Sequence, residues 1–238
     1  MASQPIVGAL HGGLLTALGT AIVSGEYPGG QVLTLDGVSA RYGVSRSVAR
    51  EAIRVLESMG MAASRRRVGI TVQSAEKWNV FDPLLIRWRL EAGDRAAQLV
   101  SLSELRRGFE PVAAALAARR ANPDQCRVMA ATVSDMVVHG RAGDLEAYLQ
   151  ADKVFHQTLL EASGNEMFRA LNGVVAEVLT GRTHHGMMPV TPNPAAIDLH
   201  DDVARAIRTR NAEAAELAMR AIIDEASSAV TVEISGRD

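Results

Sequence analysis

The sequence predicts a mainly α-helical chain in which a short strand-containing segment precedes an all-helical body. Alanine, leucine, arginine and glutamate recur at helical spacing almost everywhere after residue 95, and aromatic residues make up only 4% of the chain. Residues of these types favour helices. Strand-forming sequence is confined to the first third, chiefly at 31–35 (QVLTL) and 69–73 (GITVQ). We therefore expect a small N-terminal domain followed by an antiparallel helical bundle.

Composition restricts the class of protein. The 238 residues are 47% hydrophobic and carry a net charge of -2, which argues against a uniformly basic nucleic-acid coat. A single cysteine, Cys126, leaves no internal disulfide, as is typical of a reducing compartment. Neither a signal peptide nor an apolar run of membrane-spanning length is evident. We expect a soluble cytoplasmic protein without a membrane partner.

Within the first 75 residues the sequence predicts two consecutive helices joined by a tight turn. Helical periodicity over 9–24 ends at the turn-forming sequence GEYPGG. A short helix fits 36–42, Gly43 supplies a turn, and Ser45 is the expected N-cap of a helix that ends near residue 60. On this last helix we expect a buried face formed by Val48, Ala52, Val55 and Met59.

The positive charge of this segment is concentrated on one predicted surface. Residues 1–75 contain seven arginines, no lysine and four acidic residues. Arg46, Arg50 and Arg54 recur every four residues, and Arg65 to Arg67 precede a strand-forming stretch that suits a β-wing. An arginine stripe alone is typical of a solvated helix face. Its combination with the turn, the preceding helix and the wing instead favours a recognition helix that enters the major groove of DNA.

The stretch GVSRSVAREAIRVLESMG, followed by VGITV, closely resembles the winged helix-turn-helix of the GntR superfamily of bacterial repressors. The resemblance implies that double-stranded operator DNA is the partner and that Gly69 lies at the wing tip. Members often carry a DNA-contacting arginine in the preceding helix, where this chain has Asp36. The expected DNA-binding residues are Arg46, Ser47, Arg50, Arg54, Arg66 and Gly69.

Residues 76–83 have no clear helical or strand period and are predicted to link residues 1–75 to a second domain, 84–238. In that domain the stretches ELRRGFEPVAAALAARRA, DKVFHQTLLEASGN and HDDVARAIRTRNAEAAELAM resemble, in order, three motifs of the FCD effector and dimerisation domain of the FadR subfamily. The linker resembles the branch that contains regulators of sugar-acid catabolism. Helices are expected at 81–93, 99–121, 122–140, 144–162, 166–182, 194–211 and 212–230.

Three polar residues interrupt apolar helix faces in the second domain. Asp152 and His156 are four apart on a face with Leu149 and Leu159, and His200 lies on a later apolar stripe. Such groups either satisfy one another in the core or bind a divalent transition ion. Resemblance to metal-binding FCD domains, which use an Asp, a His four residues later and a His on each of two later helices, implies a metal site. The metal is expected to be zinc, with nickel or manganese as alternatives.

The fourth ligand of that pattern is missing, because its position is occupied by Ile222. Either the site has become a structural polar cluster, or three protein ligands leave positions open to water or an effector. Arg106 matches the position from which FCD domains often bind an effector carboxylate, and Arg182 and His184 are expected at the mouth of the cavity.

These features predict a homodimeric transcriptional repressor whose operator binding responds to a small carboxylate, such as the sugar acids gluconate or galactonate. The alternative is a metal-free FCD regulator that responds to an acyl or other apolar effector. A metal-dependent enzyme is disfavoured, because no carboxylate is placed as an obvious general base and the N-terminal domain would have no role.

Overall fold

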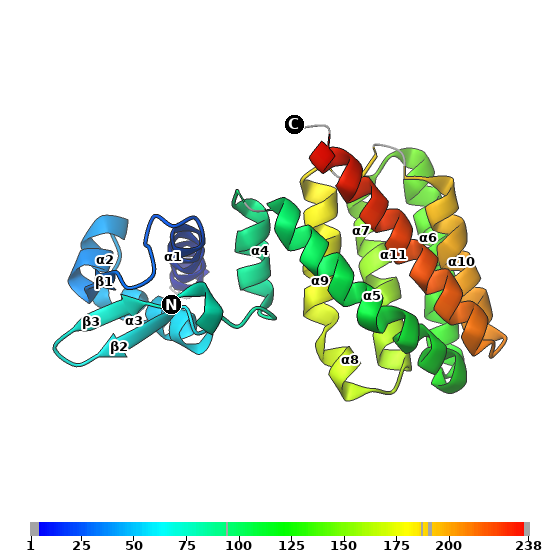
Figure 1. Cartoon of the computed structure of the whole chain (residues 1–238), viewed down its shortest axis with the longest axis horizontal. Coiled ribbons are helices and arrows are strands. Elements are labelled where there is room, and N and C mark those ends of the chain that lie inside the picture. Colours follow the sequence, from blue (N-terminus) through cyan, green and yellow to red (C-terminus); the bar gives the residue numbers. More distant parts are fainter. Residues whose placement is uncertain (1–4, 94, 187, 190–191, 236–238) are drawn as a thin grey trace. The chain divides into compact units, whose positions relative to one another are not determined.

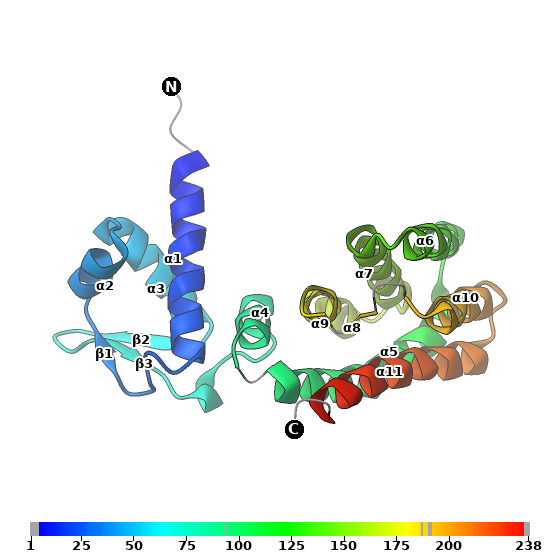
Figure 2. The same cartoon turned by 90° about the horizontal axis from the view of Figure 1, so that it is seen from above.

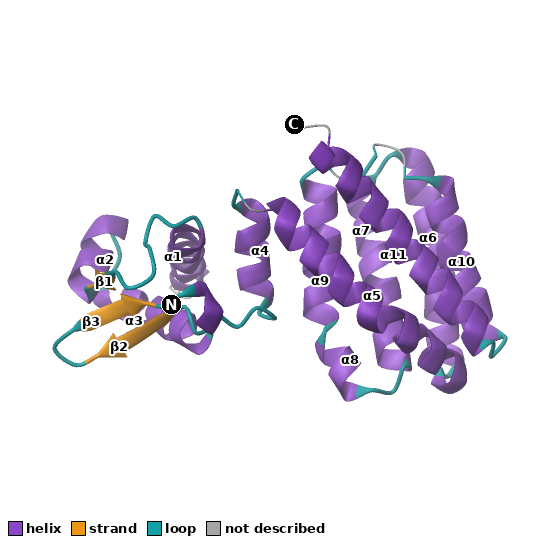
Figure 3. Cartoon of the chain, in the orientation of Figure 1, coloured by secondary structure: helices purple, strands orange, loops and turns teal. Residues whose placement is uncertain are grey.

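The computed structural model describes residues 5–93, 95–186, 188–189 and 192–235, and the chain divides into two compact units, residues 1–95 and 96–238 (Figure 1). Among the described residues, strands occur only in the first unit and the second is helical (Figure 3). The predicted fold class is therefore confirmed. The first unit contains α1 (Pro5–Val23), β1 (Val32–Leu33), α2 (Leu35–Tyr42), α3 (Arg46–Ser58), β2 (Ala62–Arg65), β3 (Gly69–Val72), the 3-10 helix η1 (Ala75–Lys77) and α4 (Pro83–Glu91).

Helices α2 and α3 form the predicted helix-turn-helix. Gly43 ends α2 in the left-handed conformation, with φ of 64°, and so turns the chain toward α3. The Ser45 hydroxyl then accepts a hydrogen bond from the Val48 amide at 3.3 Å, which confirms the predicted N-cap.

The buried face of α3 differs from the prediction. Its fully buried residues include Ala49, Ile53 and Leu56, whereas Val48 and Val55 are only half-buried. The core of this unit, which includes α1, therefore receives a face rotated by about one residue. Only Ala52 and Met59 of the expected stripe are fully buried.

The wing is a three-stranded antiparallel sheet in the order β1-β3-β2. Ala63 of β2 and Val32 of β1 both pair with Thr71 of the central strand. The turn at the tip consists of residues 66–68, and Arg67 adopts a positive φ of 66° there.

Gly69, which was expected at the wing tip, directly follows the turn and pairs with Arg65 at the outer end of the hairpin. It is the first residue of β3, with φ of 112°, and a Cβ at this position would lie 2.7 Å from the Leu33 carbonyl oxygen. Position 69 therefore requires glycine, because β1 approaches the backbone closely there.

Helix α4 belongs to the first unit, although the sequence suggested a boundary at residues 76–83. Trp88 of α4 is fully buried, and its indole packs against the backbone of Gly19 in α1. The absence of a side chain at Gly19 makes this contact possible, since a Cβ there would lie 2.3 Å from the Trp88 ring.

The second unit is an antiparallel bundle in which α5 and α11 run across one side of α6, α7, α9 and α10 (Figure 2). The predicted helix 166–182 is two helices that meet at Leu171. Asn165 caps the first, short helix, and the second begins directly after Leu171. Within the described residues the helices are α5 (Arg95–Arg120), α6 (Pro123–Ala142), α7 (Leu145–Ala162), α8 (Glu166–Ala170), α9 (Asn172–His184), α10 (Pro194–Arg208) and α11 (Ala212–Ser235).

The bundle core draws on α5, α6, α7, α9, α10 and α11 and contains Phe109, Phe155, Leu159, Val203 and Met219. Within the part of the chain that the structure describes, no helix is both long and apolar enough to cross a membrane.

The packing of α4 on α1 can be tested with a matched pair of substitutions. Gly19→Ala should destabilise the first unit by about 1 to 3 kcal/mol, because it forces a methyl group into the Trp88 ring. Gly13→Ala, on the same helix with no atom within 4 Å of the added Cβ, should be neutral or stabilise by up to about 1 kcal/mol. Both tryptophans, Trp78 and Trp88, lie in this unit, so tryptophan fluorescence during urea unfolding reports it. Equal midpoints for the two variants would contradict the packing.

Candidate functional site

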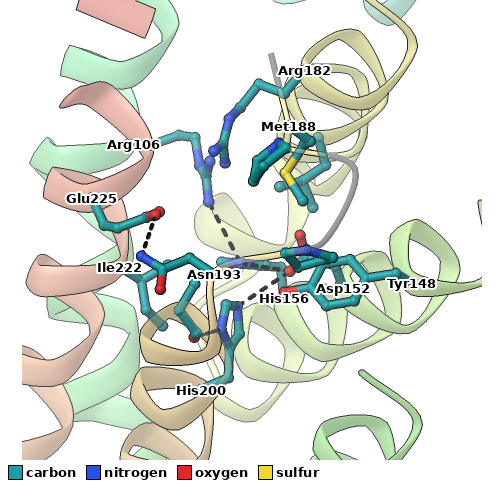
Figure 4. Close-up of a pocket in the computed structure, with 14 residues that line it drawn as sticks. Arg106, Tyr148, Asp152, His156, Arg182, Met188, Asn193, His200, Ile222 and Glu225 are labelled. Carbon is teal, nitrogen blue, oxygen red and sulfur yellow. Dashed lines mark hydrogen bonds and ion pairs between the residues drawn. The ribbon is translucent and has the colours of Figure 1, made fainter. Parts of the chain in front are cut away.

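The three polar residues predicted to share a site meet inside the bundle (Figure 4). Asp152 and His156 project from α7, and His200 projects from α10. Asp152 Oδ1 lies 3.4 Å from His156 Nε2 and 3.3 Å from His200 Nε2. All three residues are buried, and one potential ligand atom from each lies within 4.8 Å of the others. Their convergence supplies one carboxylate oxygen and two imidazole nitrogens at a single point.

Contacts on the far side of His200 fix its orientation. Its Nδ1 lies 2.6 Å from the Ala196 carbonyl oxygen, one turn earlier on α10. Since a carbonyl can only accept, Nδ1 donates this hydrogen bond, and Nε2 faces Asp152. Phe155, fully buried, packs edge-on against both imidazoles at centroid distances of 5.7 and 5.0 Å and restricts their rotation.

A buried carboxylate that the sequence analysis missed, Glu110, holds the other imidazole. Its Oε1 accepts a 2.5 Å hydrogen bond from Arg106 Nε, and its Oε2 lies 2.7 Å from His156 Nδ1, within ion-pair distance but outside hydrogen-bond geometry. Arg106, Glu110 and His156 are each at most 2% exposed. The spacing of Arg106 and Glu110, four residues apart on α5, is the signal that could have revealed them.

The proximity of these charges determines their protonation. Burial alone would raise the pKa of Glu110, but Arg106 and His156 outweigh burial and lower it to about 2. Burial would lower the pKa of His156, yet Glu110 and Asp152 raise it to about 9. Burial likewise opposes ionisation of Asp152, but the two neighbouring histidines outweigh burial and lower the pKa of its carboxyl group. The carboxylates are therefore ionised in the folded protein.

Several buried polar atoms at the centre of the cluster remain without a hydrogen bond among the described residues. They include Asp152 Oδ1 and His200 Nε2, the atoms that face one another. A buried polar atom without a hydrogen bond lowers the stability of the fold by about 1 to 3 kcal/mol, so these atoms indicate that a further ligand binds here. A divalent cation fits this donor set, since carboxylate oxygen and imidazole nitrogen are common zinc ligands. The cluster is thus compatible with a metal site.

Ile222 of α11 lines the same cavity and is 5% exposed. An isoleucine cannot ligate a metal. Three of the four ligands in the pattern of metal-binding FCD domains are therefore present. Glu225, one turn later, also lines the cavity, and its Oε1 accepts a 3.4 Å hydrogen bond from Asn193.

Two buried guanidinium groups line the cavity near the cluster. Arg106 uses Nε and Nη2 to bind Glu110, at 2.5 and 3.3 Å, and its Nη2 also lies 3.5 Å from His156 Nε2. Arg182 comes from α9, is 9% exposed, and its Nε has no hydrogen-bond partner among the described residues. Burial and the like charge of Arg106 lower the pKa of Arg182. A cation in this environment would gain from an anionic ligand.

The other residue expected at the mouth, His184, is not among the described residues that line the cavity. Its imidazole is about half exposed, and its Nε2 lies 3.0 Å from Glu146 Oε2 on α7. The structure therefore brings together Arg106 and Arg182 with the Asp-His-His cluster and leaves His184 outside.

The cavity is small. The space open to the centres of water molecules is about 40 Å³, and each water needs roughly 10 to 15 Å³ by that measure. An ion with two or three waters would fit. Described residues of the α9–α10 connection, including Met188 and Pro192, form part of its wall.

The first unit exposes most of its predicted DNA-binding residues. Arg46, Ser47, Arg50 and Arg54 are exposed on α3, and Arg66 is exposed on the wing turn. Arg46 forms a bidentate ion pair with Asp36 of α2, and Arg54 forms a 2.7 Å ion pair with Glu51.

A winged helix-turn-helix joined to a helical domain with a charged cavity defines a DNA-binding regulator of the ligand-responsive type. Comparison with known families agrees: residues 13–72 match the bacterial regulatory proteins of the gntR family, and residues 101–225 match the FCD domain. The chain belongs to the GntR family of transcriptional regulators and carries an FCD domain.

Relatives of similar length support this assignment. The galactonate operon transcriptional repressor of Escherichia coli is 27% identical over 213 residues, which cover 88% of this chain and 92% of that protein. Among solved structures, a GntR protein of Streptococcus agalactiae is 25% identical, with a TM-score of 0.50 over 92% of this chain and 99% of its own. McbR/YncC of E. coli shares the fold at 16% identity, with a TM-score of 0.56 over 98% and 100% of the two chains.

The buried Arg106–Glu110 pair can be tested by removing one partner. Glu110→Gln should destabilise the helical unit by about 3 to 5 kcal/mol, because it leaves a buried guanidinium uncompensated. Glu104→Gln, at an exposed position of the same helix, is the matched control and should change stability little. Far-UV circular dichroism during urea unfolding measures both variants.

Replacing both partners by methionine should recover much of the loss, because neither member of the pair is then left as a buried charge without its counter-ion. A Glu110→Gln variant as stable as the Glu104→Gln control would show that the ion pair does not stabilise the fold.

Proposed function

We propose that this regulator is a repressor whose operator binding is controlled by a small organic acid, bound at a divalent cation that Asp152, His156 and His200 hold. The observation that carries the proposal is the pair of buried potential ligand atoms on Asp152 and His200 that lack a hydrogen bond, beside the Arg182 guanidinium, whose Nε also lacks one. The first group of atoms suits a cation, and the second suits an anion. A single cavity that contains both fits an acid bound next to a metal ion.

Zinc is the proposed ion, with nickel or manganese as alternatives. Zinc accepts imidazole and carboxylate ligands together, and three protein ligands leave further positions for water or an exogenous oxygen. Bound there, the ion would act as a Lewis acid toward carboxylate and hydroxyl oxygens. Glu110 and the Ala196 carbonyl would serve as the outer partners that orient the two histidines.

The proposed effector is a sugar acid such as gluconate or galactonate. One of its oxygens would face the cation, and its carboxylate would pair with Arg182 and with the free edge of Arg106. The printed name of the E. coli relative, a galactonate operon repressor, supports this class of compound. The charged walls of the cavity suit an acyl chain poorly, because two guanidinium groups and Asp152 would face it.

The size of the cavity suggests how binding is transmitted. A six-carbon acid exceeds the present space, so side chains of the wall must move before it can bind. The acid therefore binds a conformation that differs from this one, and its differential affinity shifts the population toward that conformation. In a homodimer, which we propose as the operator-binding form, such a shift would change the fit of two recognition helices to two half-sites.

Metal content tests the first part of the proposal. Elemental analysis of purified protein should give about one zinc, nickel or manganese per chain, and His200→Ala should reduce that content to background. His139→Ala, which changes a histidine of α6 outside the cluster, should keep it. The proposal fails if the wild type carries no metal and a chelator leaves its unfolding temperature unchanged.

Effector binding tests the second part. Gluconate or galactonate should raise the unfolding temperature of the metal-loaded protein, since a ligand of the folded state stabilises it by mass action. Arg182→Met should abolish this shift, because it removes one of the two cavity guanidinium groups that would bind the carboxylate of the acid. His184→Ala should retain it, because that side chain pairs with Glu146 outside the cavity. A shift obtained only with long-chain acyl compounds would favour the metal-free apolar alternative instead.

A further inference from the structure

The recognition helix begins at an arginine that is already paired. Arg46 is the first residue of α3, and its Nε and Nη2 donate to the two carboxylate oxygens of Asp36, in the first turn of α2. Both side chains are about two-thirds exposed, at 68% and 65%. The pair therefore lies at the surface, at the end of α3 whose residues reach base edges in a helix-turn-helix complex.

The geometry of the pair leaves a defined part of the guanidinium free. Arginine has five N–H donors in one plane. Asp36 occupies the side edge formed by Nε and Nη2. The end edge, with one proton of Nη1 and the second proton of Nη2, stays open and offers two parallel donors. Guanine presents two matching acceptors, O6 and N7, in the major groove.

We propose that Asp36 determines operator specificity by holding Arg46 in position to read a guanine. A free arginine side chain has several rotamers and can contact phosphate instead of a base. With Asp36 bound on its side edge, the plane of the guanidinium is fixed and its end edge presents the guanine-reading pair of donors. Asp36 is thus a positioning residue that acts through Arg46.

The charge of Asp36 serves the same purpose. A carboxylate beside Arg46 cancels its net charge, so the pair attracts phosphate less than a lone arginine would. Non-specific binding is weakened, while the hydrogen-bond donors that recognise guanine are retained. Arg50 and Arg66 are exposed on the same unit, and we assign the attraction of phosphate to arginines of this kind.

The position of Asp36 is itself fixed by the start of α2. The Thr34 hydroxyl caps this helix by accepting from the Gly37 amide at 3.0 Å. A carboxylate in the first turn of a helix is favoured by the helix dipole. Asp36 therefore stands on a defined backbone and can orient Arg46 rather than follow it.

Selection from a random double-stranded DNA library, followed by sequencing, tests this proposal on the full-length protein. The wild type should enrich a guanine at one position that Arg46→Ala no longer enriches. Asp36→Asn should lower that enrichment by roughly threefold to tenfold, since one bidentate arginine–guanine pair discriminates by about that factor or more. It should also strengthen binding to non-specific DNA and steepen its salt dependence.

Two controls separate positioning from charge and from direct readout. Glu26→Gln removes a carboxylate from another exposed ion pair of the same unit, with Arg41, and should leave the guanine enrichment unchanged. The double variant Asp36→Asn/Arg46→Ala should show the same base preferences as Arg46→Ala alone, because Asp36 acts through Arg46. Circular dichroism verifies that each variant is folded.

Three results would overturn the proposal. The first is a guanine enrichment that Asp36→Asn or Arg46→Ala does not change. The second is a loss at a different base pair in each variant, which would mean that Asp36 reads a base itself, as a carboxylate accepts from cytosine N4. The third is an equal loss in Glu26→Gln, which would assign the effect to net charge.

Discussion

The buried chain of charges from Arg106 through Glu110 to His156 is the interaction on which the interior of the helical unit depends. Removing an ionised group from water costs several kcal/mol, and this cost is recovered only when the partners are close and well oriented. Glu110 meets both requirements, because one oxygen binds Arg106 and the other faces His156. The same contacts turn His156 so that Nε2 faces Asp152. The ion pairs that compensate the buried charges therefore also orient a candidate metal ligand.

That balance also explains the kind of ligand the cavity favours. Arg106 and Glu110 compensate each other, which leaves Asp152 to offset Arg182 across the cavity, with Glu225 at its edge. A divalent cation at Asp152 would give the cavity a net positive charge and would repel Arg182, whose Nε has no hydrogen-bond partner. An anion bound between the cation and Arg182 would remove this repulsion. Cation and acid are thus expected to bind cooperatively. Ile222 offers no metal ligand, so the side of the site toward α11 would be open to the proposed effector.

Parts of this site could be predicted from the sequence, because they depend on local spacing. Asp152 and His156 are one helical turn apart on an apolar face, and the wheel alone places them together. Glu110 has the same relation to Arg106, but on the alanine-rich α5 it reads as an ordinary surface pair until the fold shows both residues buried. The contact of Trp88 with Gly19 could not be predicted, since nothing in either helix indicates its partner. The rotation of the α3 core face has the same origin, because the neighbouring elements select which face is buried.

A bidentate arginine–carboxylate pair occurs in both units and has a different consequence in each. Around Glu110 the pair is buried, so its main effects are to compensate two buried charges and to orient the His156 imidazole. Around Asp36 it is exposed, where an ion pair contributes little to stability and solvent screens its charge. Selection for stability would not maintain such a pair, but its geometry still restricts the guanidinium plane. Under the proposal that Arg46 reads a guanine, the role of the exposed pair is to direct the free edge of the Arg46 guanidinium toward the DNA bases.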